Sequence, residues 1–285
     1  MEKGPVLAAA ISSDTTQTPL LGFVSRVGLG RVLKLYVHSI KAAGGRVADS
    51  ECIWDVDLQS IPGPVNHVTL GWAGRRIVIG VNTRYYLAWG AKGNESTGVV
   101  KGSLMELLAM EQGTGPVRLA PLPKQKAVIL VTGSIAIAVN AVGEAVGNPI
   151  SLEGIPHLQD LAVGNGLVAF LTMDGLHLYE PMAGKHIQSL SFDLNTMEVP
   201  LRASSGGSVN SKVILVASPH KVWGIVPLPA SEQVRDLIIE GDLNTAEELT
   251  REGKSKGEKW AEYALVEVGR ALINGTNKRF GWCLP

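Results

Sequence analysis

Carboxylates are the first residues in this 285-residue chain whose type and spacing could do chemistry. Asp55 and Asp57 alternate with Trp54 and Val56, and paired carboxylates can serve acid–base catalysis or bind calcium. The alternation is explained more simply by a half-exposed strand. If the protein is a hydrolase, these two acids and Asp174 are the residues from which a catalytic or metal-binding site would be built.

Histidine and cysteine spacing gives no sign of a metal centre. Cys52 and Cys283 lack the paired spacing of a zinc site, and two cysteines cannot form a disulfide scaffold, which favours a reducing compartment. The six histidines are scattered, without the i, i+4 pair of a helical metal site, and we interpret them as surface or hydrogen-bonded core residues. They are His38, His67, His157, His177, His186 and His220. We expect no metal and no cofactor.

Nucleotide and nucleophile motifs are also incomplete. Gly28 and Gly30 suggest a dinucleotide-binding loop, but Leu33 occupies the place of the third glycine. Gly184 precedes a lysine as in a phosphate-binding loop, but Tyr179 stands where that loop needs its first glycine. No Gly-x-Ser-x-Gly elbow occurs. The sequence therefore predicts no catalytic residues and no cofactor-binding residues.

Charge and hydropathy exclude further classes of function. The 26 basic residues are balanced by 26 acidic ones, so we expect no basic surface for nucleic acid or an anionic membrane. The longest apolar stretch, residues 127–143, is interrupted by polar residues and is shorter than the roughly 20 residues of a membrane span. The N-terminus shows no targeting signal. These features favour a cytosolic protein that recognises partners through local surface.

The elements that must position these residues are short apolar runs, each followed by a turn and a second run. The leading runs begin at residues 77, 127, 167 and 213, at intervals of 50, 40 and 46 residues, and an earlier hairpin lies at residues 20–37. A β-propeller blade takes about 40–50 residues, so the spacing predicts a mainly β fold with about five blades. A sandwich or a doubly wound α/β domain is the competing architecture. The latter needs helices between strands, and only residues 103–111 resemble one.

The composition and the hydrophobic periodicity of the sequence change in the C-terminal tail. Residues 231–285 hold 18 of the 52 charged residues but 6 of the 33 glycines, and their apolar residues recur at helical spacing. Ser231 is placed to cap a first helix whose apolar face carries Val234, Leu237 and Ile238. Thr245 and the glutamate three residues later have the spacing of a capping box. We therefore predict a β domain over 1–230 and a helical region over 231–285.

The junction between these regions carries a family resemblance. Residues 222–229 read VWGIVPLP and continue into ASEQVRDLI, which resembles the end of the citron homology (CNH) domain of the vacuolar-sorting tether family, with residues 170–184 and 65–77 in agreement. That family includes the TGF-β receptor-associated protein and related CORVET and HOPS subunits. The resemblance implies a β-propeller followed by the first helices of an α-solenoid of clathrin-heavy-chain-like repeats. It also implies a non-catalytic tether subunit that binds a Rab-type small GTPase and other tether subunits, cytoplasmic and peripheral on endosome or vacuole membranes.

Overall fold

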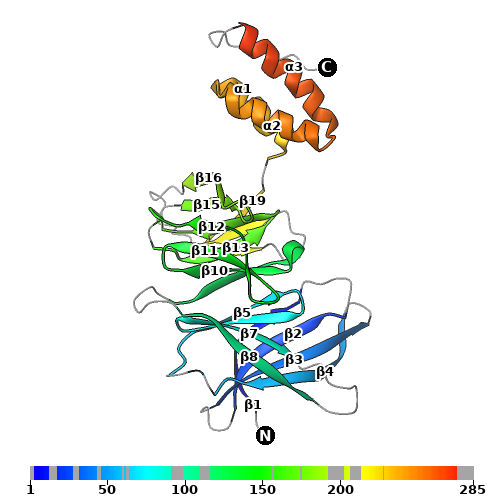
Figure 1. Ribbon diagram of the computed structural model, residues 1–285, viewed down its shortest axis with the longest axis vertical. Coiled ribbons are helices and arrows are strands. Elements are labelled where there is room, and N and C mark those ends of the chain that lie inside the picture. The colour runs from blue at the N-terminus through cyan, green and yellow to red at the C-terminus, as the bar shows by residue number, and fades with distance from the viewer. Residues whose placement is uncertain are drawn as a thin grey trace. The chain divides into compact units, whose positions relative to one another are not determined.

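The computed structural model describes residues 3–12, 18–27, 32–43, 46–59, 61, 64–90, 99–109, 116–155, 157–173, 175–191, 202–205, 213–226 and 228–274. The chain divides into two compact units, Met1–Ile225 and Val226–Pro285. In the part of the chain that the structure describes, the first unit is built from β-strands and the second from three α-helices (Figure 1), so the mainly β fold class with a helical tail is confirmed. Four residues named above, Gly28, Gly30, Asp174 and Cys283, lie outside the described residues, as does Pro227 of the junction.

The described strands of the β unit form five successive antiparallel meanders, here called sheets 1 to 5. Sheet 1 contains β1 (Lys3–Ile11), β2 (Leu20–Val27), β3 (Val32–Ala43) and β4 (Arg46–Asp57). Sheet 2 contains β5 (Val68–Ala73), β6 (Arg76–Val81), β7 (Arg84–Gly90) and β8 (Val100–Ala109). Sheet 3 contains β9 (Arg118–Leu122), the 3-10 turn Pro123–Gln125, β10 (Ala127–Thr132), β11 (Ile135–Asn140) and β12 (Ala145–Ser151). Sheet 4 contains β13 (Asp160–Gly164), β14 (Leu167–Leu171), β15 (Gly175–Glu180) and β16 (Lys185–Ser191), and sheet 5 contains β17 (Arg202–Ser205), β18 (Ile214–Ala217) and β19 (Val222–Ile225).

The apolar runs lack polar alternation because both faces of the central strands are buried. In β10, Ala127 and Ile129 belong to the core shared with sheet 4, whereas Val128 and Leu130 belong to the core shared with sheet 2. Within the described residues, one such apolar core lies between each sheet and the next. The first strands of successive sheets, β1, β5, β9, β13 and β17, lie side by side. Meanders that stack through their faces around adjacent first strands are the blades of a β-propeller.

Sheets 1 and 2 are also joined along their last strands (Figure 1). β4 and β8 run parallel and pair at Trp54 with Val100 and at Asp55 with Lys101. The two meanders thus become one eight-stranded sheet, in the order β1-β2-β3-β4-β8-β7-β6-β5, which encloses a common apolar core. This short pairing brings β4 next to the end of β7, where the candidate site lies.

The one helix-like segment of the β unit is a strand. Residues 103–109 belong to β8, which pairs with β7 from Arg84 opposite Ala109 to Gly90 opposite Gly102. The leucine, methionine and glutamate of this segment favour a helix when isolated. Pairing with β7 provides hydrogen-bond partners along one edge of the strand, and this tertiary pairing outweighs the weak helical preference.

The helical unit consists of α1 (Ala230–Glu240), α2 (Leu243–Ser255) and α3 (Lys259–Asn274), whose core includes Val234, Ala246 and Val268. The predicted apolar face of α1 is therefore confirmed. The predicted caps are wrong: the N-cap of α1 is Pro229, two residues before Ser231, and Asp242 rather than Thr245 caps α2. None of the helices among the described residues has the length and apolar composition of a membrane-spanning segment.

Candidate functional site

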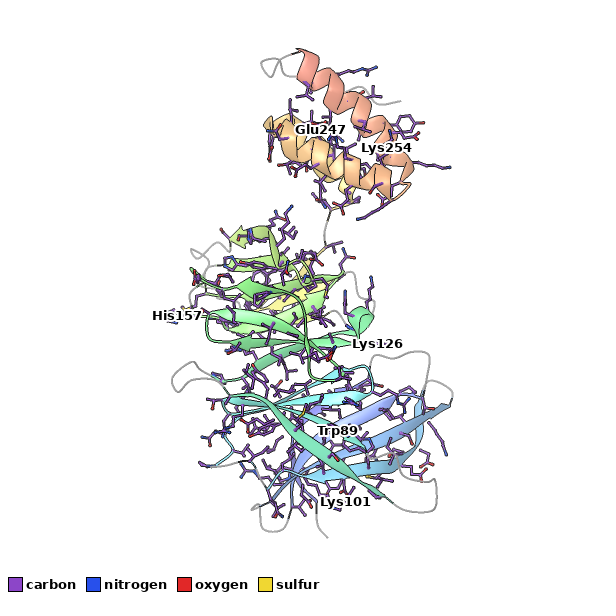
Figure 2. The ribbon with its side chains drawn as sticks, viewed as in Figure 1. Trp89, Lys101, Lys126, His157, Glu247 and Lys254 are labelled. Atoms are coloured by element: carbon purple, nitrogen blue, oxygen red, sulfur yellow. The ribbon has the colours of Figure 1, made fainter. Side chains whose placement is uncertain are left out.

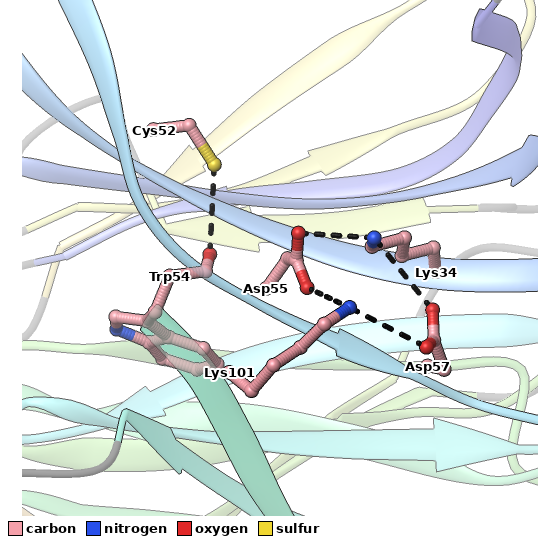
Figure 3. A network of polar contacts seen from close by, with 6 residues as sticks. All are labelled: Lys34, Cys52, Trp54, Asp55, Asp57 and Lys101. Atoms are coloured by element: carbon pink, nitrogen blue, oxygen red, sulfur yellow. Dashed lines mark hydrogen bonds and ion pairs between the residues drawn. The ribbon is translucent and has the colours of Figure 1, made fainter. Parts of the chain in front are cut away.

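The two predicted acids, Asp55 and Asp57, form an ion-paired network with two lysines (Figure 3). Lys34 on β3 lies 3.0 Å from one Asp55 oxygen, and Lys101 on β8 lies 2.9 Å from the other. The same ammonium groups reach Asp57 at 3.7 and 3.5 Å. The strand is not half-exposed at Asp55, because that residue is only 8% exposed. The structure does bring the two acids together, but with a lysine on either side.

This pairing determines the protonation of Asp55. Burial raises the pKa of the Asp55 carboxyl, but hydrogen bonds and charge attraction from Lys101 and Lys34 outweigh it and hold the pKa below its ordinary value. The hydrogen bond to Asp55 correspondingly raises the pKa of Lys101 above its ordinary value. A carboxylate held ionised in this way is a weak base and cannot serve as an acid at neutral pH. The network is therefore suited to joining β3, β4 and β8.

Among the described residues, the histidines and Cys52 do not gather into a site. Over the described residues, no three His, Cys, Asp or Glu side chains are close enough to hold a metal ion. The Cys52 thiol donates to the Trp54 carbonyl at 3.7 Å. His177 on β15 and His186 on β16 lie 2.8 and 2.9 Å from the hydroxyl of Ser189 on β16. These contacts join the last two strands of sheet 4.

A cavity of about 580 Å³ lies where sheet 1 meets sheet 2. Both Ile53 and Trp54 line it, although neighbouring residues of a regular strand point to opposite faces. A β-bulge explains this, because Val37 pairs with Trp54 and His38 with Cys52, which leaves Ile53 as the extra residue. Bulges change the direction of side chains in this way near binding and active sites.

The rest of the cavity comes from sheet 2 and β2. Arg75 and Arg76 follow Gly74, whose φ of +60° allows the tight turn between β5 and β6. The Arg76 guanidinium lies over the ring of Trp89 (labelled in Figure 2), 5.1 Å from its centroid, as in a cation–π contact. Leu20 and Gly90 complete the lining. The cavity thus combines apolar surface with two guanidinium groups.

Two glycines hold the indole of Trp54 in place. A Cβ atom added at Gly90 or at Gly102 would come within 2.8 Å of that indole, and the two glycines face each other on β7 and β8. Trp54 therefore lies directly against the backbone of sheet 2, and it is only 6% exposed. Sequence reasoning missed this cavity. The arginine pair after a Gly turn was a visible signal, but its meeting with β4 depends on the bulge and on the β4–β8 pairing.

Comparisons with known proteins find partial likeness in fold. No family model matches the chain, and no curated protein matches it. Similar solved structures include the AfRom2 CNH domain, with 10% identity and a TM-score of 0.44 over 78% of this chain and 65% of that chain. BamB from Moraxella catarrhalis has 10% identity and a TM-score of 0.42 over 78% of this chain and 74% of that one. Sqt1 from Chaetomium thermophilum has 19% identity and a TM-score of 0.47 over 79% of this chain and 59% of that one. The chain thus spans less than two thirds of the AfRom2 and Sqt1 chains.

Proposed function

We propose that this protein is a non-catalytic interaction scaffold, a tether subunit in endosome-to-vacuole (lysosome) traffic that binds a Rab-type GTPase and other tether subunits. The observation that carries the binding role is the cavity formed by Trp54, Trp89 and Arg76, which offers a partner apolar surface and hydrogen-bond donors. The choice of pathway is supported by the resemblance of the junction sequence to citron homology domains. The protein would reach endosome or vacuole membranes peripherally, through these partners.

The ion-paired acids favour binding over the alternative, a propeller hydrolase. Such an enzyme needs one carboxyl able to give up or accept a proton, or a set of acids open to a cation. Asp55 instead lies between Lys34 and Lys101, which hold it ionised and occupy both of its oxygens. Asp55 therefore helps to hold three strands in position, and the recognition of partners is assigned to the cavity that Trp54 lines.

The test measures GTP-dependent binding by the full chain. Endosomal and vacuolar Rab proteins, each loaded with GTP or with GDP, are passed over the immobilised protein, followed by purified tether subunits. We expect at least one Rab to bind at least tenfold more tightly in its GTP form. If neither a Rab nor a tether subunit binds, the tether role is wrong. Turnover of glycoside or lactone substrates that Asp55→Asn abolishes while the protein stays folded would establish the hydrolase instead.

A further inference from the structure

We propose that the cavity between sheets 1 and 2 binds a short peptide segment of a partner protein, through a carboxylate side chain within two positions of a large apolar or aromatic one. This inference deepens the interaction role proposed above, on which it rests, by naming the chemistry that the partner must present. It follows from the apolar part of the cavity, the guanidinium groups and the charge of the lining.

The apolar side chains of the cavity are preorganised, because the fold holds them in position without a ligand. Ile53 reaches it because of the bulge in β4, and Trp54 is fixed against Gly90 and Gly102. A side chain held in one place loses little conformational freedom when a ligand binds, so its contacts contribute more to affinity. The cavity volume, about 580 Å³, leaves room for more than one side chain of a bound segment.

The guanidinium groups give the cavity its preference for an acid. Arg76 lies over the face of Trp89, a contact that leaves the N–H groups in the guanidinium plane able to donate. Two of these N–H groups match the two oxygens of a carboxylate, and the aromatic ring beside them is a surface for the neighbouring apolar side chain. Arg75 adds positive charge at the same edge of the cavity, and Arg76 is the residue that we assign to the carboxylate.

Charge complementarity points to the same partner. Among the described residues, the lining of the cavity includes two arginines and no carboxylate. An acidic group that enters it therefore meets attraction without a competing internal ion pair at Arg76. A free nucleotide is the other ligand that could stack on tryptophan beside arginine. It is disfavoured because most of the lining is apolar and the chain has no glycine-rich phosphate-binding loop.

The experiment selects peptides without assuming a partner. The full chain is screened with a phage-displayed library of random 12-residue peptides, and the enriched peptides are synthesised with a fluorophore and titrated by anisotropy. We expect enriched sequences to place Asp or Glu within two positions of Trp, Phe, Leu or Met. Replacing that acid by its amide should weaken binding to the wild-type protein at least tenfold, a result that needs no protein variant.

Protein variants locate the binding. Arg76→Gln should weaken binding at least tenfold, and Arg76→Glu should select basic peptides in place of acidic ones. Arg84→Gln is the matched control, because Arg84 lies on β7 and pairs with Glu106 at 2.9 Å outside the cavity. Circular dichroism checks that each variant is folded.

Several results would overturn the proposal: enriched peptides without acids, equal affinity of the acid and amide peptides, or binding that Arg76→Gln leaves unchanged. Displacement of the labelled peptide by ADP at lower concentration than by the acidic peptide would assign the cavity to nucleotides. If peptides fail while a GTP-loaded Rab still binds, only this inference is wrong. If peptides bind while Rab and tether subunits do not, only the tether role is wrong.

Discussion

Asp55 on β4 and Lys101 on β8 are joined in two ways, as register partners of a parallel strand pair and by an ion pair of 2.9 Å. The pairing has only one other register position, Trp54 with Val100. The last strands of sheets 1 and 2 are therefore held together by a short stretch of backbone and by this ion pair. Since Trp54 also lines the candidate cavity, the ion pair helps to fix one of its walls.

The first prediction is that Asp55 and Asp57 contribute unequally to the free energy of unfolding. Asp55→Asn should lower the free energy of unfolding by about 1–3 kcal/mol, because two charged hydrogen bonds of a buried carboxylate are lost. Asp57→Asn is the matched control and should cost at most about 1 kcal/mol, since its side chain is 46% exposed and its ion pairs are longer. Urea unfolding measures both. Equal losses would contradict the larger contribution assigned to the buried Asp55.

The lowered pKa of Asp55 gives a second prediction, on acid stability. In the unfolded chain Asp55 titrates near its ordinary pKa of 3.8, and in the folded protein it titrates at lower pH. Its contribution is therefore complete above about pH 4–5 and is lost as pH falls through the folded pKa. The stability difference between wild type and Asp55→Asn, measured by urea unfolding from pH 7 to pH 2, should shrink below pH 4. A constant or growing difference would contradict the ion-pair mechanism.

The strands could be predicted from sequence, whereas the cavity could not. Strands such as β10 are buried on both faces, so burial alone requires the apolar run that begins at Ala127. The cavity depends on a one-residue change of register at Ile53, for which the sequence contains no marker, and on Gly90 and Gly102 facing each other under Trp54. Likewise, the sequence predicts a half-exposed strand at Asp55, and only the parallel pairing of β4 with β8 places Lys101 beside that residue. These are long-range relationships, and local patterns do not encode them.

A third prediction tests the seam between sheets 2 and 3. The fully buried Tyr85 hydroxyl lies 2.6 Å from the Val131 carbonyl oxygen and accepts from the Arg118 amide at 3.0 Å. Burial raises the pKa of this hydroxyl to about 12, so it stays protonated and able to donate. Tyr85→Phe leaves buried backbone groups without this partner and should cost about 1–3 kcal/mol in urea unfolding. Tyr263→Phe is the control and should leave the unfolding midpoint unchanged, because Tyr263 is 78% exposed. A similar loss of stability for both variants would show that the effect of Tyr85→Phe does not come from the hydrogen bonds between sheets 2 and 3.

A fourth prediction tests two helix ends: Asp242, the observed N-cap of α2, and Ser231, the residue expected from sequence to cap α1. The Asp242 carboxylate accepts from the Thr245 amide at 3.2 Å and from its hydroxyl at 2.7 Å, whereas Ser231 lies inside α1. Asp242→Ala should therefore destabilise the helical unit by about 1 kcal/mol, and Ser231→Ala should be nearly neutral. Thermal unfolding followed by circular dichroism at 222 nm measures both. A loss of about 1 kcal/mol for Ser231→Ala would indicate that Ser231 caps α1 after all, and no loss for Asp242→Ala would contradict the cap of α2.

The last prediction is that one substitution has opposite effects at two glycines of the helical unit. In α2, a Cβ atom at Gly253 would lie 2.6 Å from the Trp260 ring and 3.1 Å from Ala261 Cβ, so the two helices approach each other at this glycine. In α3, a Cβ atom at Gly269 would meet nothing within 4 Å. Gly269→Ala should stabilise the unit by up to about 1 kcal/mol, because alanine favours the helix. Gly253→Ala gains the same preference but forces Trp260 out of its place, and such overpacking costs about 1–3 kcal/mol, so the net change should be destabilising.

Urea unfolding followed at 222 nm compares the two variants within the same unit, where the gain in helix propensity is common to both. The difference between them therefore isolates the cost of moving Trp260 away from α2. If Gly253→Ala is as stabilising as Gly269→Ala, then α2 and α3 do not pack as closely as described, and the core around Val234, Ala246 and Val268 must be looser than its burial indicates.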